Sequence, residues 1–278
     1  MKILFLFVLL AAVAPASAQY YYKDIVGTRE TADMIRAYRA QKVSRVVLQS
    51  YDGDNVRSDD FFVEQVFSPS ASSLTTTTRS GVTDASVLTA YTDASGQVVR
   101  TSDSSGAVVS TTTYQYDTEG RLLRVNSSSA DSTGAAPMTE EHHWQWAEGK
   151  PVRMLRIKDG RDTTVVTFGT DEAGNVIEER AARRGVASEP VSYFYDAQKR
   201  LTDVVRYNAK ARRQLPDYMF EYSASGQVIQ KITVPAAGSE YLIWRYQYDD
   251  KGLKIREAVF NKQKQLIGKI EYQYQFQP

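Results

Sequence analysis

The chain has 278 residues, with 34 lysines and arginines against 33 aspartates and glutamates, two histidines and no cysteine. This balance excludes the strongly basic surface of a nucleic-acid-binding or polybasic membrane-binding protein. Without cysteine the chain has no disulfide and no lipid-modified thiol, so ordinary packing must hold the fold, which a chain of this length can do.

The first residues have the layout of a cleavable secretory signal. Lys2 gives a charged start, Ile3–Val13 is apolar, and Ala16–Ala18 supplies the small residues typical of a cleavage site. The apolar run is about half of the roughly twenty residues that a transmembrane helix needs. We therefore expect cleavage after Ala18 and export from a bacterial cell, to the periplasm, the outer cell surface or the extracellular space.

The sequence predicts three parts, namely a signal peptide (1–18), an N-terminal α+β segment (19–82) and a region of β-hairpin repeats (83–278). In the second part, apolar residues at helical spacing predict one short helix over Arg29–Gln41, with Thr28 as N-cap, which we expect to cap one end of the sheet. Strands are expected at Val43–Gln49 and Phe61–Phe67. The serine-rich stretches 68–80 and 126–134 are expected to be loops or flexible segments, the first alternatively an exposed strand.

The repeat is clearest at Tyr114–Arg124, which reads YQYDTEGRLLR. Tyr114 and Tyr116 are two residues apart, so on a strand both rings lie on one face. Asp117 can accept hydrogen bonds from the backbone that follows it, and Gly120 can adopt a positive φ without steric cost. The segment therefore predicts a strand, a turn and a second strand.

Similar text returns to the end of the chain. Pairs of aromatic or apolar residues at i and i+2 begin at Tyr114, Trp144, Val166, Tyr193, Phe220, Tyr246 and Tyr272, at intervals of 30, 22, 27, 27, 26 and 26 residues. Turn residues keep the same rhythm at Gly120, Gly149, Gly174, Lys199, Gly226 and Gly252. A period in this range indicates a repeat array with two strands and two turns per repeat.

Three segments carry a family resemblance: Tyr114–Leu122 (YQYDTEGRL), Tyr193–Asp196 with Arg200-Leu201, and Tyr246–Gly252 (YQYDDKG). They resemble YD repeats, the short unit of the RHS family of bacterial surface and toxin-associated proteins and animal teneurins. The likeness extends over Tyr91 to Phe276, although a Gly-Arg pair follows the turn only at Gly120. It implies a β-strand array at the cell surface or in the envelope, sometimes linked to carbohydrate binding, and it does not imply catalysis.

The simplest topology is a mainly β, antiparallel meander of hairpins that forms an extended, twisted or curved sheet. A sheet curved around a core is the alternative. A lipid-facing barrel is disfavoured because Glu178 and Glu179 lie on opposite faces of one predicted strand, and a charge at the bilayer midplane costs roughly 2–4 kcal/mol. An uncovered edge of the final strand, Lys269–Phe276, is the place where we expect a partner to add a strand.

Catalytic and metal-binding patterns are weak. Adjacent His142 and His143 point to opposite faces of a strand, so His142 has Glu140 as its one neighbouring ligand, too few for zinc. The acidic stretch Asp52–Asp60 could bind calcium, but it is more simply a solvated turn. The repeat aspartates are interpreted as turn residues, and no GxSxG is present. We expect no enzyme activity, no cofactor and no metal.

Aromatic residues are the sharpest binding candidates. They are Trp144, Trp146, Trp244, Tyr246 and Tyr248, together with Tyr193 and Tyr195. Trp144 and Trp146 share one face of a strand and could stack on sugars, or they could be the packing pair of their repeat. We therefore predict a non-catalytic secreted scaffold or binding surface for an envelope protein or glycan. The alternatives are a periplasmic assembly factor or chaperone and a hydrolase of envelope polysaccharide with two convergent carboxylates.

Overall fold

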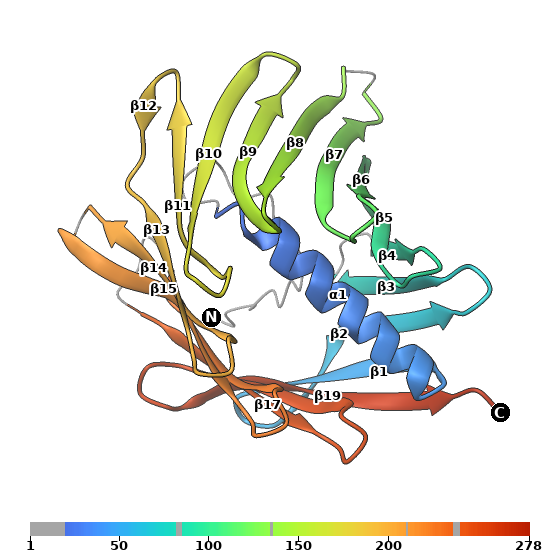
Figure 1. Ribbon diagram of the computed structural model, residues 1–278. Coiled ribbons are helices and arrows are strands. Elements are labelled where there is room, and N and C mark those ends of the chain that lie inside the picture. Colours follow the sequence, from blue (N-terminus) through green and yellow to red (C-terminus); the bar gives the residue numbers. More distant parts are fainter. Residues whose placement is uncertain (1–19, 82–84, 134–135, 210, 236–239) are drawn as a thin grey trace.

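The computed structural model describes residues 20–81, 85–133, 136–209, 211–235 and 240–278 (Figure 1). The predicted signal peptide lies outside these residues. The described chain has one helix, α1 (Lys23–Ala40). Its strands are β1 (Val43–Asp52), β2 (Arg57–Ser68), β3 (Ser73–Ser80), β4 (Ser86–Thr92), β5 (Val98–Ser105), β6 (Val108–Tyr116), β7 (Leu122–Asp131), β8 (Met138–Ala147), β9 (Lys150–Lys158), β10 (Asp162–Thr170), β11 (Val176–Arg183), β12 (Val186–Ala187), β13 (Val191–Tyr195), β14 (Leu201–Asn208), β15 (Arg213–Tyr222), β16 (Val228–Thr233), β17 (Leu242–Tyr248), β18 (Lys254–Phe260) and β19 (Leu266–Phe276).

The strands follow one another as an antiparallel meander that closes into a barrel. Each strand pairs with its sequence neighbour except that β12 and β13 both pair with β11, and β19 also pairs with β1, with Leu48 opposite Tyr272. All strands except the two-residue β12 belong to the ring (Figure 1). The meander of hairpins was predicted correctly, but the open, extended sheet was wrong. Twist accumulates along the strand order, and here it brings the last strand beside the first.

The free edge predicted at the C-terminal strand, Lys269–Phe276, is closed in part. Glu271 lies opposite Gln49 of β1 on one side and opposite Arg256 of β18 on the other. Lys269–Glu271 are therefore paired on both sides, whereas in the described ladders Tyr272–Phe276 pair with β1 alone, so strand addition on the β18 side of that segment stays a prediction.

A four-residue turn recurs eight times in the described chain. In each copy the first backbone N–H donates to the carbonyl of the fifth residue, and the fourth N–H donates back to the first carbonyl. The copies begin at Asp52, Asp93, Asp117, Asp171, Asp196, Ser223, Asp249 and Asn261. The fourth residue has a positive φ, 78° at Gly120 and 62° at Lys199, which confirms the predicted turn chemistry. Glu148-Gly149, by contrast, is a tight two-residue turn between β8 and β9.

A repeated side-chain hydrogen bond links neighbouring repeats. The second aromatic residue of a pair donates to a backbone carbonyl just after the turn of the preceding repeat, as Tyr248 Oη does to Val228 at 2.9 Å. The same bond joins Tyr116 to Val98, Trp146 to Leu122, Tyr195 to Val176, Tyr222 to Leu201 and Tyr274 to Lys254. This bond gives a physical reason for the recurring tyrosine, because it satisfies a carbonyl at the end of the neighbouring strand.

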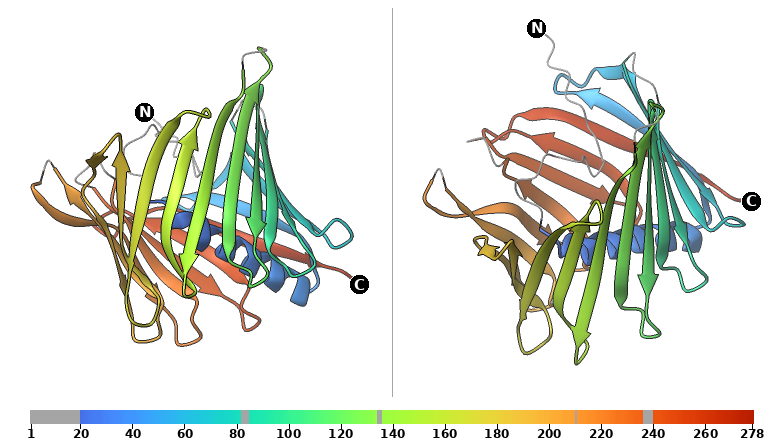
Figure 2. Two further views of the ribbon diagram at one scale, coloured as in Figure 1. Left: turned by 45° about the horizontal axis from the view of Figure 1, so that its top comes forward. Right: turned by 90° about the horizontal axis from the view of Figure 1, so that it is seen from above.

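The helix begins earlier than predicted and lies inside the barrel rather than over the end of a sheet (Figure 1, Figure 2). Thr28 is not an N-cap; its hydroxyl donates to the carbonyl of Asp24 within the helix. The apolar spacing was read correctly, since Ala32, Ile35 and Tyr38 are buried against the wall. The serine-rich stretches expected to be flexible largely form β3 and the second half of β7.

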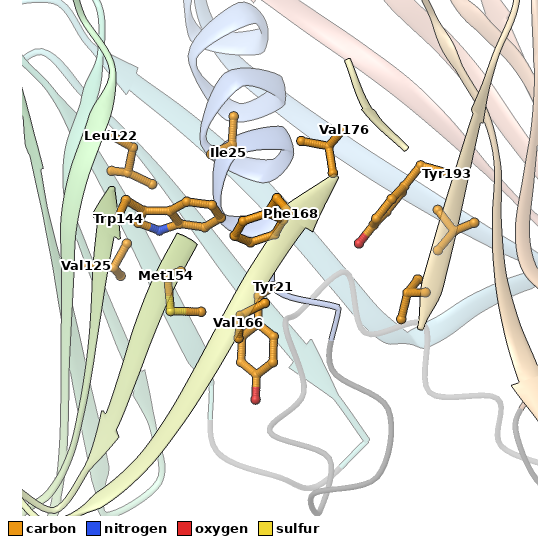
Figure 3. Packing of buried hydrophobic residues seen from close by; sticks show 12 residues of the cluster. Tyr21, Ile25, Leu122, Val125, Trp144, Met154, Val166, Phe168, Val176 and Tyr193 are labelled. Atoms are coloured by element: carbon orange, nitrogen blue, oxygen red, sulfur yellow. The ribbon is translucent and has the colours of Figure 1, made fainter. Parts of the chain in front are cut away.

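Two apolar clusters attach α1 to opposite parts of the wall. Tyr21, just before the helix, and Ile25 in its first turn pack among residues of β7 to β14 (Figure 3). Its C-terminal residues Ile35 and Tyr38 pack with residues of β1 to β4, β19 and the loop before β18. The helix therefore forms part of the core of the barrel.

Candidate functional site

A buried carboxylate holds the start of α1. Glu179 on β11 accepts hydrogen bonds from the backbone N–H groups of Tyr21 and Tyr22 at 2.8 and 2.9 Å, and from the hydroxyl of Tyr193 at 2.7 Å. Burial raises the pKa of Glu179, and these donors oppose the rise. The carboxylate thus satisfies the backbone N–H groups of the two residues that lead into the helix.

A second polar network joins α1 to β8 and β9. His142 Nδ1 lies 2.6 Å from Asp24 of the helix, and His142 Nε2 lies 2.9 Å from Glu140, which also binds Arg156 at 2.5 Å. Burial alone would lower the pKa of His142, but Asp24 and Glu140 raise it to about 9. Burial would raise the pKa of Glu140, but His142 and Arg156 lower it to about 2. These buried ion pairs attach the helix to the barrel wall.

The wall formed by β15 to β19 carries lysines over aromatic rings. Lys231 Nζ lies 5.1 Å from the ring centre of Tyr218, and Lys254 Nζ lies 4.6 Å from that of Tyr246. The surrounding protein raises the pKa of Glu30 on α1 by desolvating its carboxylate, and the charges of Lys231 and Lys254 oppose that rise. We call these five residues, with Phe220 and Tyr272, the luminal surface.

A pocket of about 670 Å³ opens beside β9 to β16. Its lining includes Tyr21 from the chain before α1, and Arg156, Arg183 and Arg206 from the wall. Arg206 pairs with Asp217, and Arg183 pairs with Asp162. Such a volume is in the range of ligand sites, and its mixed polar and apolar lining suits an amphipathic ligand.

The two tryptophans of β8 that were predicted to bind a ligand make packing contacts within the barrel wall. Trp144 is 4% exposed and stacks on Phe168 with ring centres 5.0 Å apart (Figure 3). The Trp146 indole N–H donates to the carbonyl of Leu122 at 2.8 Å, and Arg121 lies over its ring. Both side chains lie in repeat packing. Tyr193 and Tyr195 are also engaged within the structure. The Tyr193 hydroxyl donates to Glu179, and the Tyr195 hydroxyl donates to the carbonyl of Val176.

The predicted residues of β17 lie on its inner face. Trp244 donates to the hydroxyl of Thr233 at 3.3 Å, and Tyr248 makes the inter-repeat bond described above. Tyr246 belongs to the luminal surface beside Lys254. Ligand binding by Trp244, Tyr246 and Tyr248 stays a prediction, and the structure groups Tyr246 with residues from four other strands and α1.

The acidic stretch Asp52–Asp60 begins with one of the eight repeated turns. Asp52 Oδ1 accepts the backbone N–H groups of Asp54 and Val56 at 3.0 and 2.8 Å, so this carboxylate is used by its own turn. His142 and His143 bind different carboxylates, Glu140 and Glu141, as expected of opposite faces. Among the described residues, no group of three or more histidine or acidic residues is arranged to hold a metal ion.

Sequence reasoning missed Glu179, Lys231, Lys254 and Glu30. Each is a charged residue in a strand or helix whose neighbours in space are distant in the chain. The one available signal was Glu178-Glu179, adjacent acids of which one had to face inward; the structure makes Glu178 exposed and Glu179 buried.

Comparisons with known structures give partial likenesses. A chain in the crystal structure of TcdB2–TccC3–Cdc42 matches with a TM-score of 0.36 and 13% sequence identity. The match covers 78% of this chain and 12% of that chain. The Tc holotoxin pore of Photorhabdus luminescens is 12% identical with a TM-score of 0.35 and the same coverage, so this chain spans about an eighth of both toxin chains. A porin-like protein from Bacteroides uniformis is 10% identical with a TM-score of 0.34, covering 84% of this chain and 97% of that one.

The sequence comparisons are narrower. No curated protein sequence matches the chain. Among the described residues, no helix is long and apolar enough to cross a membrane. The family model described as RHS Repeat matches residues 88–132, which include most of β4, all of β5 to β7 and the turns at Asp93 and Asp117. The resemblance that the tyrosine and turn pattern predicted is therefore confirmed, and the chain carries an RHS repeat at residues 88–132.

Proposed function

We propose that the protein is a non-catalytic, exported β-scaffold that binds a glycan on the luminal surface. The observation that carries this proposal is the pairing of ammonium groups with aromatic rings on one wall, facing a carboxylate from α1. Lys254 lies over the rings of Tyr246 and Tyr272, and Glu30 lies on the helix side. Rings offer flat contact area, and charged groups offer hydrogen bonds to hydroxyl and acidic substituents of a sugar.

The polar groups that a catalytic site would use support binding rather than catalysis. Both histidine rings are engaged by carboxylates, and Asp117, Asp171, Asp196 and Asp249 accept backbone hydrogen bonds in their own turns. A general base needs a free acceptor within hydrogen-bond reach of its substrate. The predicted signal peptide and the resemblance to RHS proteins support a secreted location.

A glycan array probed with residues 19–278 tests the proposal. We expect binding to at least one glycan, at least tenfold weaker in Tyr246→Ala and Lys254→Ala. Arg245→Ala and Gln247→Ala are matched controls on the opposite, exposed face of β17 and should bind like the parent. Cleavage of the bound glycan, absence of glycan binding, or equal loss in the control variants would contradict the proposal.

A further inference from the structure

The barrel wall is interrupted between β12 and β14. The short strand β12 pairs with β11, Val186 lying opposite Arg183. The next strand, β13, pairs with β14 only as far as Val191, which lies opposite Arg206. Beyond that point the β11–β12 hairpin and the β14–β15 hairpin diverge (Figure 1).

We call the gap between these hairpins the notch. It is bordered by two short strand edges, Val186–Ala187 of β12 and Tyr207–Asn208 of β14. Tyr207 and Asn208 pair with β15 on one side, and in the described ladders nothing pairs with their other side. The same is true of Val186 and Ala187 on the side away from β11. Val186, Tyr207 and Asn208 all line the 670 Å³ pocket, so the two edges border one space. An unpaired edge is a template for another strand.

Local chemistry keeps the notch open. Glu189 and Pro190 stand between β12 and β13, where a continuous strand would have bridged β11 and β14. Proline has no backbone N–H and cannot donate to a ladder. The side chain of Val186 is 74% exposed, an apolar residue on a strand edge with no cover.

The rim of the notch is basic. Arg183 and Arg184 lie at the tip of one hairpin, Arg212 and Arg213 at the tip of the other, and all four are exposed. Residues 182–187 and 208–214 contain no aspartate or glutamate. Arg183 has one carboxylate partner, Asp162 of β10. A ligand that enters between these tips meets positive charge from both sides.

We propose that the notch captures an extended, acidic segment of a partner polypeptide as an added β-strand between β12 and β14. Backbone groups of the two edges would supply the ladder, the pocket would hold alternate side chains, and the arginines would select acidic residues. The proposal does not depend on the glycan site, because none of the residues of the luminal surface lines this pocket.

The experiment selects dodecapeptides from a random phage-displayed library on immobilised residues 19–278, and the enriched peptide is then synthesised. We expect enrichment in aspartate and glutamate, and binding by fluorescence anisotropy that weakens at least tenfold between 50 and 500 mM salt, since added salt screens exposed charges. Hydrogen exchange of the complex should slow the amides of β12 and of Tyr207–Asn208.

Charge-reversal variants locate the site. Arg184→Glu and Arg212→Glu are in hairpin tips and should fold normally while weakening the peptide at least tenfold. Arg79→Glu, an exposed arginine of β3, is the matched control and should leave binding unchanged. The proposal is overturned by absence of enriched peptides, by enrichment without acidic residues, by undiminished binding to Arg184→Glu and Arg212→Glu, or by protection outside the notch. A glycan from the array that protects the amides of the notch would also overturn it.

Discussion

Glu179 Oε1 accepts the backbone N–H of Tyr21 at 2.8 Å, a contact between residues 158 positions apart. The donor belongs to the segment just before α1, and the acceptor faces inward from the middle of the repeat region. This bond makes the N-terminal segment part of the barrel interior.

Glu179→Gln should destabilise the protein by about 1–3 kcal/mol. A glutamine offers one acceptor oxygen in place of two, and its amide would face the donors of Tyr21, Tyr22 and Tyr193, which leaves a buried polar group without a partner. Urea denaturation measures the change. Glu178→Gln, on the exposed face of the same strand, should change the stability by less than about 0.5 kcal/mol. Equal effects of the two substitutions would show that the buried carboxylate does not hold the helix.

His142 should make stability depend on pH. Its pKa is raised from 6.5 to about 9 in the folded protein, so its contribution is fully present below pH 6.5 and is lost as the pH rises through 9. We expect the free energy of unfolding to fall by roughly 1–3 kcal/mol between pH 6 and pH 10 through this group. His142→Gln should remove that dependence and His143→Gln should keep it; the reverse result would refute the assignment.

The same network predicts resistance to mild acid. The pKa of Glu140 is lowered from 4.5 to about 2, so its contribution is present above pH 4.5 and is lost only as the pH falls through 2. Urea denaturation between pH 5 and pH 2 in the parent and in Glu140→Gln should therefore give curves that converge at the acid end. Parallel curves would show that the carboxylate is not stabilised by its partners.

The inter-repeat hydrogen bond should have a measurable energy. Tyr248→Phe removes the hydroxyl that donates to Val228 and should cost about 0.5–1.5 kcal/mol. The control is Tyr207→Phe, because the Tyr207 side chain is 39% exposed and should tolerate loss of its hydroxyl. Thermal unfolding of both variants measures the difference, and equal midpoints would mean that the bond adds nothing to stability.

Lys199→Gly should stabilise the protein by about 0.5–1 kcal/mol. Lys199 holds a φ of 62° in a turn where Gly120, Gly226 and Gly252 hold the equivalent position, and a side chain there is strained. The reverse change, Gly226→Ala, keeps the space but adds the strain, because a Cβ at Gly226 meets nothing within 4 Å. It should destabilise by a similar amount. A lower denaturant midpoint for Lys199→Gly, or a higher one for Gly226→Ala, would disprove the role of this position.

The local part of the fold could be predicted from the sequence. Tyr116, Asp117 and Gly120 lie within one hairpin, and their chemistry is short-range, so the turn, the strand pair and the repeat were visible in the pattern. The match of β1 to β19 was not visible, because a pairing between residues such as Leu48 and Tyr272 depends on the summed twist of every strand between them.

The site was harder to predict for a related reason. The tryptophans of β8 were obvious as large rings, but only the fold shows that Trp144 is covered by Phe168 and that Trp146 bonds to Leu122. Lys231, Lys254 and Glu30 have ordinary sequence surroundings and become neighbours through closure of the barrel and the position of α1 inside it. The notch depends on Pro190, whose effect appears only once β11 and β14 are on either side of it.

Closure of the barrel between β1 and β19 is the claim on which the lumen and its surface depend, and backbone amide exchange in Tyr272–Gln275 tests it most directly. In the strand ladders these residues pair with β1, Tyr272 opposite Leu48 and Gln275 opposite Arg45, and they extend beyond the paired residues of β18. A closed barrel predicts slow exchange for the amides of this segment that point to β1, comparable with those in the middle of β10. Fast exchange of all four amides would contradict closure and return the protein to an open sheet.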